Sequence, residues 1–523
     1  MSAARALAAS VAALALATTA AFPEPRGRRL RGSDSLARAY DAILNARFES
    51  AASELERACP LKPLRRSDGV APVEACDVLR ATAVWWRIQL DPHSLALDPK
   101  FEELAEEAIE GAEAWTERDP MDAEAWFYLG GAYAARAQWR VLRQERFAAA
   151  RDGKRIKEAL DRALALDPQL ADAYFGLGLY KYYADVAPSM AKLLRWFLLL
   201  PGGDREEGLT AMLKVRDAGE LLQGEADYQL HLIYLWYEER ADLALDRLET
   251  LQARYPANPH FSTQIAEVHE VYFHDVPASL AAYRALLAAA REKRVMMPQL
   301  AAAQARLSIA KHLETLHESD RAIEQLRSVL AARPDAPFGV VSEANLRLGQ
   351  SYDRLGMQTQ AIAAFNAALD AAPAGDPHRI RPRAKSALGR RTPAREGEAY
   401  RLSLEGWRAF ERGETAAAAA TLGRSLRLVP TDFVARARYG HVLSARRQDT
   451  LALAEIDRAL AARTDAPPSL VAAAYLDAGA IHERAGRRTA AIATYRLASE
   501  VFGSGADARD AATRALARLT TTP

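Results

Sequence analysis

The stretch AEVHEVYFHD, residues 266–275, holds the densest group of side chains able to bind a metal ion. Glu270 and His274 are four residues apart, so they share one face of a helix. Zinc proteases instead place two histidines four residues apart, with a glutamate beside the first. Because this spacing is missing, we interpret the stretch as the polar end of a helix and expect no bound metal. Its candidate ligands are Glu267, His269, Glu270, His274 and Asp275.

No other pattern in the sequence indicates catalysis. A glycine-rich phosphate loop, a Gly-x-Ser-x-Gly nucleophile elbow and a paired-cysteine metal motif are all missing. The segment PGGDREEG is more simply explained as a turn in which Asp204 caps the next helix. We therefore predict a non-enzymatic protein with no catalytic residue and no cofactor.

The two cysteines, Cys59 and Cys76, flank a segment rich in proline, glycine and charged residues, which is typical of a surface loop between two helices. In an oxidising compartment we expect them to form one disulfide. A bridge across a loop of this size stabilises the folded state by about 3 kcal/mol through loop-closure entropy. The alternative is two unrelated structural thiols. Without clustered histidines, the pair does not indicate a zinc site.

The N-terminus indicates export. Arg5 precedes an apolar segment, residues 6–17, and small residues then lead to Phe22-Pro23. This order predicts a signal peptide over residues 1–21 and a periplasmic or secreted protein, with no cysteine at the cleavage site for a lipid anchor. Four arginines between residues 26 and 31 favour the alternative, an uncleaved alanine-rich helix, because positive charge beyond the apolar core hinders translocation.

The composition limits the class of protein. The 523 residues exceed one ordinary domain, so several domains or a repetitive array must be present. Half of the residues are hydrophobic, and long stretches rich in Ala, Leu, Arg and Glu favour helices. Lys plus Arg number 69 against 68 for Asp plus Glu. This balance gives no basic field, so nucleic acid is not an expected partner.

A helical repeat explains the length. Its clearest copy runs from Ser342 to Pro373, with Gly349 and Tyr352 in a first helix, Gly356 at a turn and Phe365 in a second helix. Small residues let two helices approach closely, and the aromatic residues fill the seam between them. This unit resembles the tetratricopeptide repeat, whose period is about 34 residues. The resemblance implies stacked antiparallel helix hairpins.

The same pattern recurs around Gly406, Gly440 and Gly479, and less regularly between Tyr40 and Leu326. We therefore predict an all-α fold, an α-solenoid with a tetratricopeptide-like superhelix. The expected domains are an N-terminal array over 34–373, a basic Pro/Arg linker over 374–395, and a C-terminal array over 396–523 closed by a capping helix near 507–519. The linker is expected to be solvated and mobile, or else to contact anionic lipid head groups or an acidic partner.

Two departures interrupt the repeat. Trp126 and its counterpart Tyr174 lie 48 residues apart, which exceeds the 34-residue period by 14. Because this segment has no helix breaker, it predicts one long helix over 126–151. The next unit contains an apolar insertion, 184–204, with the run KLLRWFLLL at 192–200. This run is too short to span a bilayer, so we expect it to pack locally, to plug the inner face or to contact a membrane surface.

The tetratricopeptide resemblance also implies a concave face lined by the first helix of each hairpin. On the matched units this face should be aromatic and apolar at first and polar further along, unless the aromatic residues fill the seams instead. The apolar candidates for binding are Phe127, Phe175, Leu179, Tyr182, Tyr183, Trp196, Phe197, Ile233, Trp236 and Tyr237. The polar positions are Gln304, Lys311, Glu314, Glu343, Gln350, Asp353 and Arg354.

These features predict an interaction scaffold of the bacterial cell envelope that binds an extended peptide or a protein through a few buried aromatic anchors. The alternative is a periplasmic carrier or transport accessory that encloses a lipid or another apolar small molecule. The scarcity of lysine near the aromatic positions argues against a basic clamp for a C-terminal carboxylate.

Overall fold

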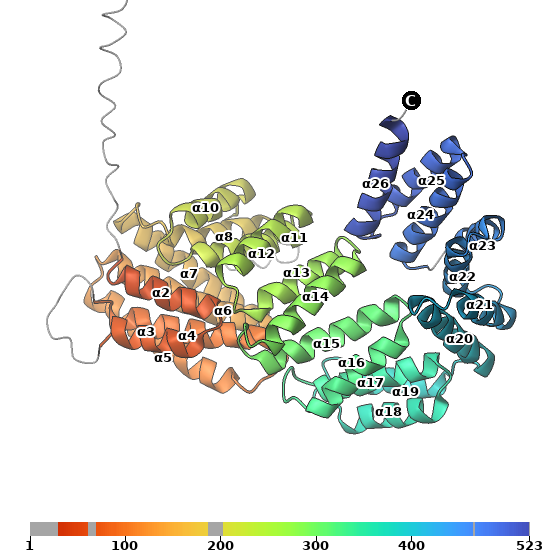
Figure 1. The fold of residues 1–523 in the computed structure, drawn as a ribbon. Coiled ribbons are helices and arrows are strands. Elements are labelled where there is room, and N and C mark those ends of the chain that lie inside the picture. Colours follow the sequence, from red (N-terminus) through yellow and green to blue (C-terminus); the bar gives the residue numbers. More distant parts are fainter. Residues whose placement is uncertain (1–29, 61–69, 187–201, 464–465, 522–523) are drawn as a thin grey trace, which may run out of the picture. The chain divides into compact units, whose positions relative to one another are not determined.

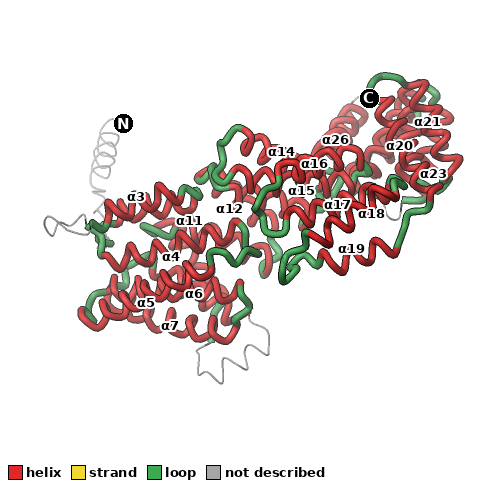
Figure 2. The backbone as a smooth tube through the Cα atoms, turned by 90° about the horizontal axis from the view of Figure 1, so that it is seen from below, coloured by secondary structure: helices red, strands yellow, loops and turns green. Residues whose placement is uncertain are grey.

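The structure, a computed structural model, describes residues 30–60, 70–186, 202–463 and 466–521. Every regular element in these ranges is a helix, as the backbone tube in Figure 2 shows. The predicted all-α fold of stacked helix hairpins is confirmed. The chain divides into two compact units, of which unit 1 comprises residues 1–38, 54–80 and 104–223, and unit 2 comprises residues 39–53, 81–103 and 224–523.

The first helices, labelled in Figure 1, contribute residues to both units. They are α2 Ser33–Leu44, α3 Phe48–Ala58, α4 Val73–Leu90 and α5 Asp98–Arg118. Unit 1 continues with α6 Ala123–Leu142, α7 Arg146–Leu166, α8 Ala173–Val186 and α10 Arg205–Ala218.

Unit 2 continues from α11 to the C-terminus. Its helices are α11 Gln223–Trp236, α12 Ala241–Arg254, α13 Pro259–Val271, α14 Val276–Arg291, α15 Pro298–Thr315, α16 Ser319–Ala332, α17 Val340–Arg354, α18 Gln358–Asp370, α19 Ile380–Gly389, α20 Ala394–Glu411, α21 Thr415–Leu428, α22 Phe433–Ala445, α23 Asp449–Ala461, α24 Pro468–Arg484, α25 Arg488–Glu500 and α26 Ala506–Thr521. The predicted capping helix is α26.

The repeat pattern produces each hairpin through one close contact. In the α17–α18 hairpin, a Cβ on Gly349 would lie only 2.5 Å from the Phe365 ring, so glycine lets the ring lie directly against the first helix. Gly356 makes the turn between the two helices with a positive φ of +67°. The predicted matches at Gly406, Gly440 and Gly479 meet Leu422, Ile456 and Tyr495 in the same way.

The long helix expected over 126–151 is two helices in the structure. α6 ends at Leu142, Gln144 takes a left-handed conformation with φ 65°, and α7 begins at Arg146. The inserted residues lengthen both helices, to 20 and 21 residues. Because α7 folds back on α6, the buried Asp152 of α7 accepts hydrogen bonds from two arginines of α6, Arg140 at 2.6 Å and Arg136 at 3.0 Å. Leaving that carboxylate unpaired would be costly, which favours the hairpin.

The segment 374–395 does not divide the array in two, because unit 2 continues through it. It contains α19, whose Ile380 and Ala384 are buried in the same apolar core as α17 and α18. Arg383 donates to Glu343 of α17 at 2.9 Å, and Thr392 donates to Asp353 of α17 at 2.8 Å. The segment expected to be a mobile linker therefore contains an ordered helix, which packs on α17 and α18 and forms an ion pair through Arg383.

Cys59 and Cys76 form the predicted disulfide, which joins the end of α3 to the start of α4 with the two Cα atoms 6.5 Å apart. The predicted cap at Asp204 is also present, since its side chain accepts from the Glu207 N–H at the start of α10. The expected signal peptide, 1–21, and the run 192–200 lie outside the described residues. Among the helices that are described, none is long and apolar enough to cross a membrane.

The C-terminal repeat contacts the α13–α14 turn within unit 2. The Phe502 and His274 rings lie 5.4 Å apart, centroid to centroid, and Arg509 lies 3.6 Å from Asp275. Gly503, with φ +78°, fits so tightly that a Cβ there would lie 2.6 Å from the His274 carbonyl oxygen. This contact joins segments far apart in the sequence.

Candidate binding site

Only some residues of the predicted aromatic face are exposed to solvent. Leu179 and Tyr183 are half-buried, while Trp236 and Tyr237 at the end of α11 are exposed by 59% and 41%. Trp196 and Phe197 lie outside the described residues. Four of the predicted residues are buried and fill the packing between helices, as the alternative interpretation expected: Phe127, Phe175, Tyr182 and Ile233.

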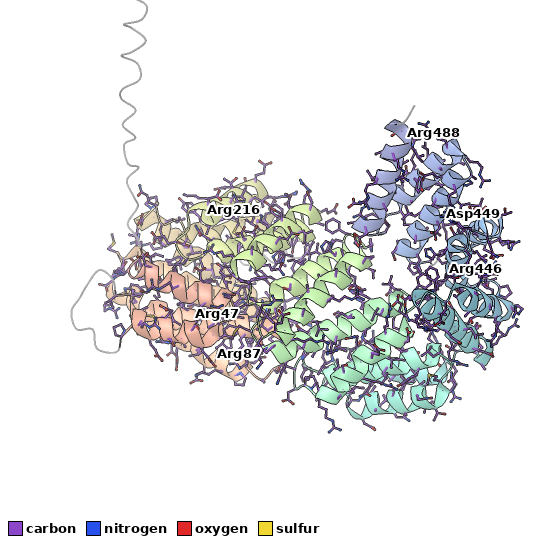
Figure 3. All side chains as sticks on the ribbon, in the orientation of Figure 1. Arg47, Arg87, Arg216, Arg446, Asp449 and Arg488 are labelled. Carbon is purple, nitrogen blue, oxygen red and sulfur yellow. A yellow bond between two sulfur atoms is a disulfide. The ribbon has the colours of Figure 1, made fainter. Side chains whose placement is uncertain are left out.

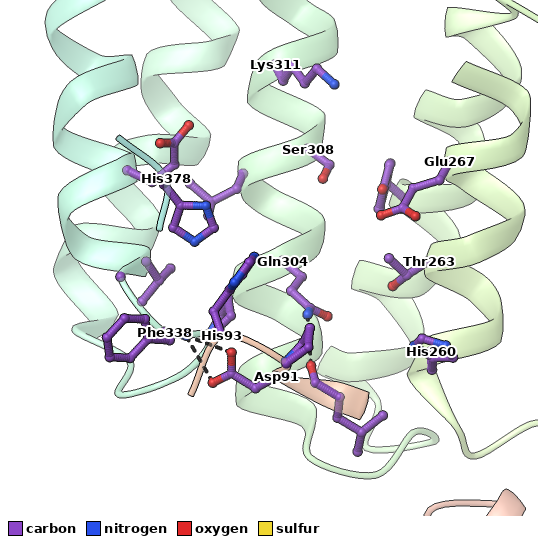
Figure 4. A pocket seen from close by; sticks show the side chains of 18 of the residues that line it. Asp91, His93, His260, Thr263, Glu267, Gln304, Ser308, Lys311, Phe338 and His378 are labelled. Atoms are coloured by element: carbon purple, nitrogen blue, oxygen red, sulfur yellow. Dashed lines mark hydrogen bonds between the residues drawn. The ribbon is translucent and has the colours of Figure 1, made fainter. Parts of the chain in front are cut away.

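Unit 2 contains a cavity of about 510 Å³ lined by the first helices of three successive hairpins, α13, α15 and α17. Three of the polar positions predicted for the inner face line it: Gln304, Lys311 and Glu343. Figure 4 shows Thr263 and Glu267 on one wall facing Gln304 and Ser308 on the next. Further lining residues are Asp91, His93, His260, Gln264, Glu270, Val271, Tyr283, Arg347, Phe338 and His378.

The end of α4 and the loop before α17 close one end of this cavity. Asp91 accepts the Phe338 backbone N–H at 3.0 Å, and Gln304 donates to the Leu90 carbonyl at 3.2 Å (Figure 4). The His93 and His378 rings meet edge to face, 4.7 Å apart. Burial raises the pKa of Asp91, against the opposing hydrogen bond from Phe338. The polar groups at this end are therefore held in place by one another.

Both cations in the cavity wall are paired with carboxylates. Lys311 of α15 forms an ion pair with Glu270 of α13. Arg347 lies 2.6 Å from Glu343 on the same helix, and Arg383 reaches the other oxygen of that carboxylate. Two of the wall's carboxylates are thus already neutralised by neighbours.

Glu267 differs from these carboxylates. Its recorded hydrogen bond comes from Gln264, Nε2 to Oε2, at 3.1 Å. The side chain is exposed, and neighbouring protein atoms displace only part of the water around it. This loss of water raises the pKa of Glu267, and the charge of Glu270 adds to the increase while Lys311 opposes it.

A layer of buried histidines supports the walls. His260 Nε2 lies 3.1 Å from the Tyr228 hydroxyl, and His312 Nε2 lies 2.8 Å from the Ser279 hydroxyl. Burial lowers the pKa of each of these two histidines to about 4. Both rings are therefore neutral near pH 7, and they position the helices without adding charge to the cavity.

The stretch considered above as a metal ligand set is dispersed in the structure. Glu267 and Glu270 line the cavity, His274 contacts Phe502, and Asp275 caps α14 by accepting from the Ala278 N–H. Within the described ranges, no group of three or more His, Cys, Asp or Glu side chains is arranged to hold a metal ion.

Sequence reasoning missed the cavity residues at the end of α4 and at His378. These come from segments outside the first helices, so the repeat register does not point to them. The proline in DPH, residues 91–93, predicts only a turn. Their position in the cavity wall follows from long-range packing.

Residues 342–374 match the tetratricopeptide repeat family. The chain therefore carries a segment, the α17–α18 hairpin, that matches the tetratricopeptide repeat. The matched segment begins in α17, and its Glu343 and Arg347 line the cavity. The cavity is therefore built in part by the repeat that matches the family. No curated protein matches the sequence.

Three solved structures are similar to this chain at low identity. A tetratricopeptide repeat protein from Parabacteroides merdae is 16% identical, with 57% of this chain and 99% of that chain covered and a TM-score of 0.26. The TPR2AB domain of yeast Sti1 in a pHSP90 complex is 13% identical, with 57% and 99% covered and a TM-score of 0.21. The human IFIT1 dimer with PPP-AAAA is 14% identical, with 82% of each chain covered and a TM-score of 0.36. Scores this low carry no inference about a ligand.

Proposed function

We propose that this protein is a non-enzymatic scaffold that binds an extended segment of a partner protein in the cavity of unit 2. Tetratricopeptide-repeat domains are protein–protein interaction scaffolds. The observation that supports this site most directly is the cavity itself, because it is formed by the first helices α13, α15 and α17 and lined by hydrogen-bonding side chains. An extended peptide leaves its backbone groups unpaired, so it needs such partners.

The polar lining favours a peptide over the alternative occupant, a lipid or another apolar small molecule. Carboxylates, amides and a lysine surround the space, and an apolar ligand would have to bury these groups without offering them hydrogen bonds. Apolar side chains, among them Val271, Leu307 and Phe338, lie between these polar groups and can contact the side chains of a peptide.

We further propose that the protein works in the bacterial cell envelope. Support comes from the Cys59–Cys76 disulfide, which fits an oxidising compartment, and from the signal peptide predicted over residues 1–21. Exposed arginines such as Arg47, Arg87 and Arg488 are spread over the surface (Figure 3), and the formal net charge is only +1. This distribution offers no support for a nucleic-acid partner.

Photocrosslinking tests the proposed site. Random 12-residue peptides are selected on the intact chain, and binders are mixed with chains that carry benzoylphenylalanine at Thr263 in the cavity or at the exposed Glu324 on α16. We expect adducts from position 263 and none from position 324. Adducts from neither position, or a lipid in native mass spectra of the purified protein, would contradict peptide binding at this site.

A further inference from the structure

The charges in the cavity wall are unequal. Among its lining residues are four carboxylates, and the cations are Lys311 and Arg347. Each of these two cations already contacts a carboxylate of the wall. The four carboxylates are Asp91, Glu267, Glu270 and Glu343.

Three of these carboxylates have strong partners. Asp91 accepts a backbone N–H with both oxygens, Glu270 pairs with Lys311, and Glu343 receives two arginines. In the part of the chain that the structure describes, Glu267 accepts a hydrogen bond from the neutral Gln264 and forms no ion pair. Its carboxylate therefore retains acceptor capacity that faces the cavity (Figure 4).

We propose that the cavity selects peptides that place a lysine or arginine side chain against the Glu267 carboxylate. This inference rests on the proposed function and adds the chemistry of the partner. An ammonium or guanidinium group donates charge-assisted hydrogen bonds to a carboxylate. Its positive charge also offsets the repulsion between Glu267 and Glu270, which are three residues apart on α13.

The walls disfavour the opposite ligand, a peptide that inserts a carboxylate. Such a ligand would have to take Lys311 from Glu270 or Arg347 from Glu343. The first exchange would leave Glu270 without its cation beside a second negative charge, and the second would leave Glu343 with Arg383 alone, so both oppose binding. Charge complementarity thus favours a cationic side chain.

An apolar position lies beside the carboxylate. Val271, one turn beyond Glu267 on α13, lines the cavity with 55% of its surface exposed, and Tyr272 follows it with 36% exposed. Apolar surface next to an acceptor suits the aliphatic stem of a lysine or arginine, which packs along it while the charged head reaches the oxygen. An aspartate or glutamate side chain has no comparable stem.

The test uses the peptides selected on the intact chain and the crosslinker at Thr263. Peptides that crosslink at Thr263 should be enriched in lysine or arginine. Replacing a lysine there with norleucine, which keeps the same carbon chain but lacks the ammonium group, should raise Kd about 10-fold, measured by fluorescence anisotropy. The variant Glu267→Gln should bind the lysine peptide about 10-fold more weakly and should not distinguish it from the norleucine peptide. The exposed α16 variant Glu324→Gln should bind like the unmodified chain.

The two proposals fail in different ways. Peptides that crosslink at Thr263 without enrichment in lysine or arginine would overturn the cationic preference and leave peptide binding intact. The cationic preference would also be wrong if Glu267→Gln still bound the lysine peptide more tightly than the norleucine peptide. It would be wrong as well if the selected peptides needed a C-terminal carboxylate to bind. If no selected peptide crosslinks at Thr263, the proposed site is wrong. Thermal unfolding of Glu267→Gln at the temperature of the unmodified chain shows that lost binding is not lost folding.

Discussion

Mild acid should destabilise unit 2 through its buried histidines. Burial lowers the pKa of His231 to about 3, and that of His260, His312 and His317 to about 4. In an unfolded chain a histidine has a pKa of about 6.5. These four folded-state values are depressed, so the rings stay neutral in the folded unit while the unfolded chain takes up protons. Their contribution to stability is complete above pH 6.5 and is lost as the pH falls from there toward 4.

The size of the effect follows from this difference. Between pH 7.5 and pH 5.5, each such histidine should lower the free energy of unfolding by about 1.4 kcal/mol, so the four together lower it by about 5 to 6 kcal/mol. Other groups act in the opposite direction and reduce the sum. Burial raises the pKa of Glu225, and at His441 the hydrogen bond and charge of Asp477 outweigh burial and raise the pKa. Replacing one histidine therefore tests the pKa assignment more directly than measuring the total pH dependence of unfolding.

His231 offers that comparison because its side chain is fully buried in α11. In the variant His231→Leu, one titrating group is removed, so acidification from pH 7.5 to 5.5 should cost about 1.4 kcal/mol less than in the unmodified chain. The matched variant Leu230→Val changes a neighbouring buried side chain that does not titrate. It should lower stability by about 1 kcal/mol at both pH values, without changing the difference between them.

The assay is hydrogen exchange of the α11 amides, read by mass spectrometry, with urea unfolding followed by circular dichroism as a second measure. Exchange reports local stability, so unit 1 does not contribute to the α11 signal. If His231→Leu loses as much stability on acidification as the unmodified chain, the ring is protonated inside the folded unit, and the assignment of a depressed pKa is refuted.

Three further predictions concern packing. The double variant Cys59→Ser, Cys76→Ser removes a disulfide between positions 17 residues apart and should lower the free energy of unfolding of unit 1 by about 3 kcal/mol. Unchanged urea unfolding in this variant would contradict the prediction. Gly349→Ala forces a Cβ into the Phe365 ring and should cost about 1 to 3 kcal/mol in thermal unfolding, whereas Gly389→Ala, with open space around it, should be nearly neutral. Gly503→Ala should speed exchange of the amides at 272–278 by loosening the contact with His274. The control Gly413→Ala changes a glycine with a similar φ but no neighbouring atoms, so it should leave the exchange of these amides unchanged. If the two variants exchange equally, Gly503 does not hold this contact.

Local sequence was sufficient for the hairpins because their contacts have a fixed register. A glycine such as Gly349 and an aromatic residue such as Phe365 occur at set distances in each repeat, so the seam they form can be predicted from spacing alone. The α6–α7 turn could not be predicted in this way. The residues around Gln144 include no helix breaker, and the turn is favoured by the pairing of Asp152 with arginines on the other helix. Helix propensities describe single residues within one helix, so they do not include an ion pair between two helices.

The segment 374–395 shows the same limit. Its prolines and arginines are typical of a mobile linker, but Ile380 and Ala384 are spaced to bury one face of α19, and Arg383 finds Glu343 on α17. Composition describes the average environment of a segment, whereas two well-placed apolar residues and one ion pair decide whether it packs.

For the site, sequence predicted the side chains that the repeat register places on the inner face. Lys311 and Glu343 lie in the cavity wall as expected, and so does Gln304. The register could not show which charges are neutralised, because the partners Glu270 and Arg383 come from other helices. The pairing of charges, which sets the proposed ligand preference, is a property of the packed structure.

The pairing also explains why one carboxylate can dominate selectivity in a cavity with several charges. Wall groups that are already bonded, such as Asp91 to Phe338 and Lys311 to Glu270, must break those bonds before they can serve a ligand, so they contribute little net affinity. Glu267 accepts a bond from the neutral Gln264 on Oε2, so its Oε1 can bind a ligand cation without breaking an ion pair. Its interaction with a ligand cation is added to the existing network and replaces none of it. Because the other charged groups of the wall are paired with one another, the cavity favours a peptide that carries one cationic side chain opposite Glu267.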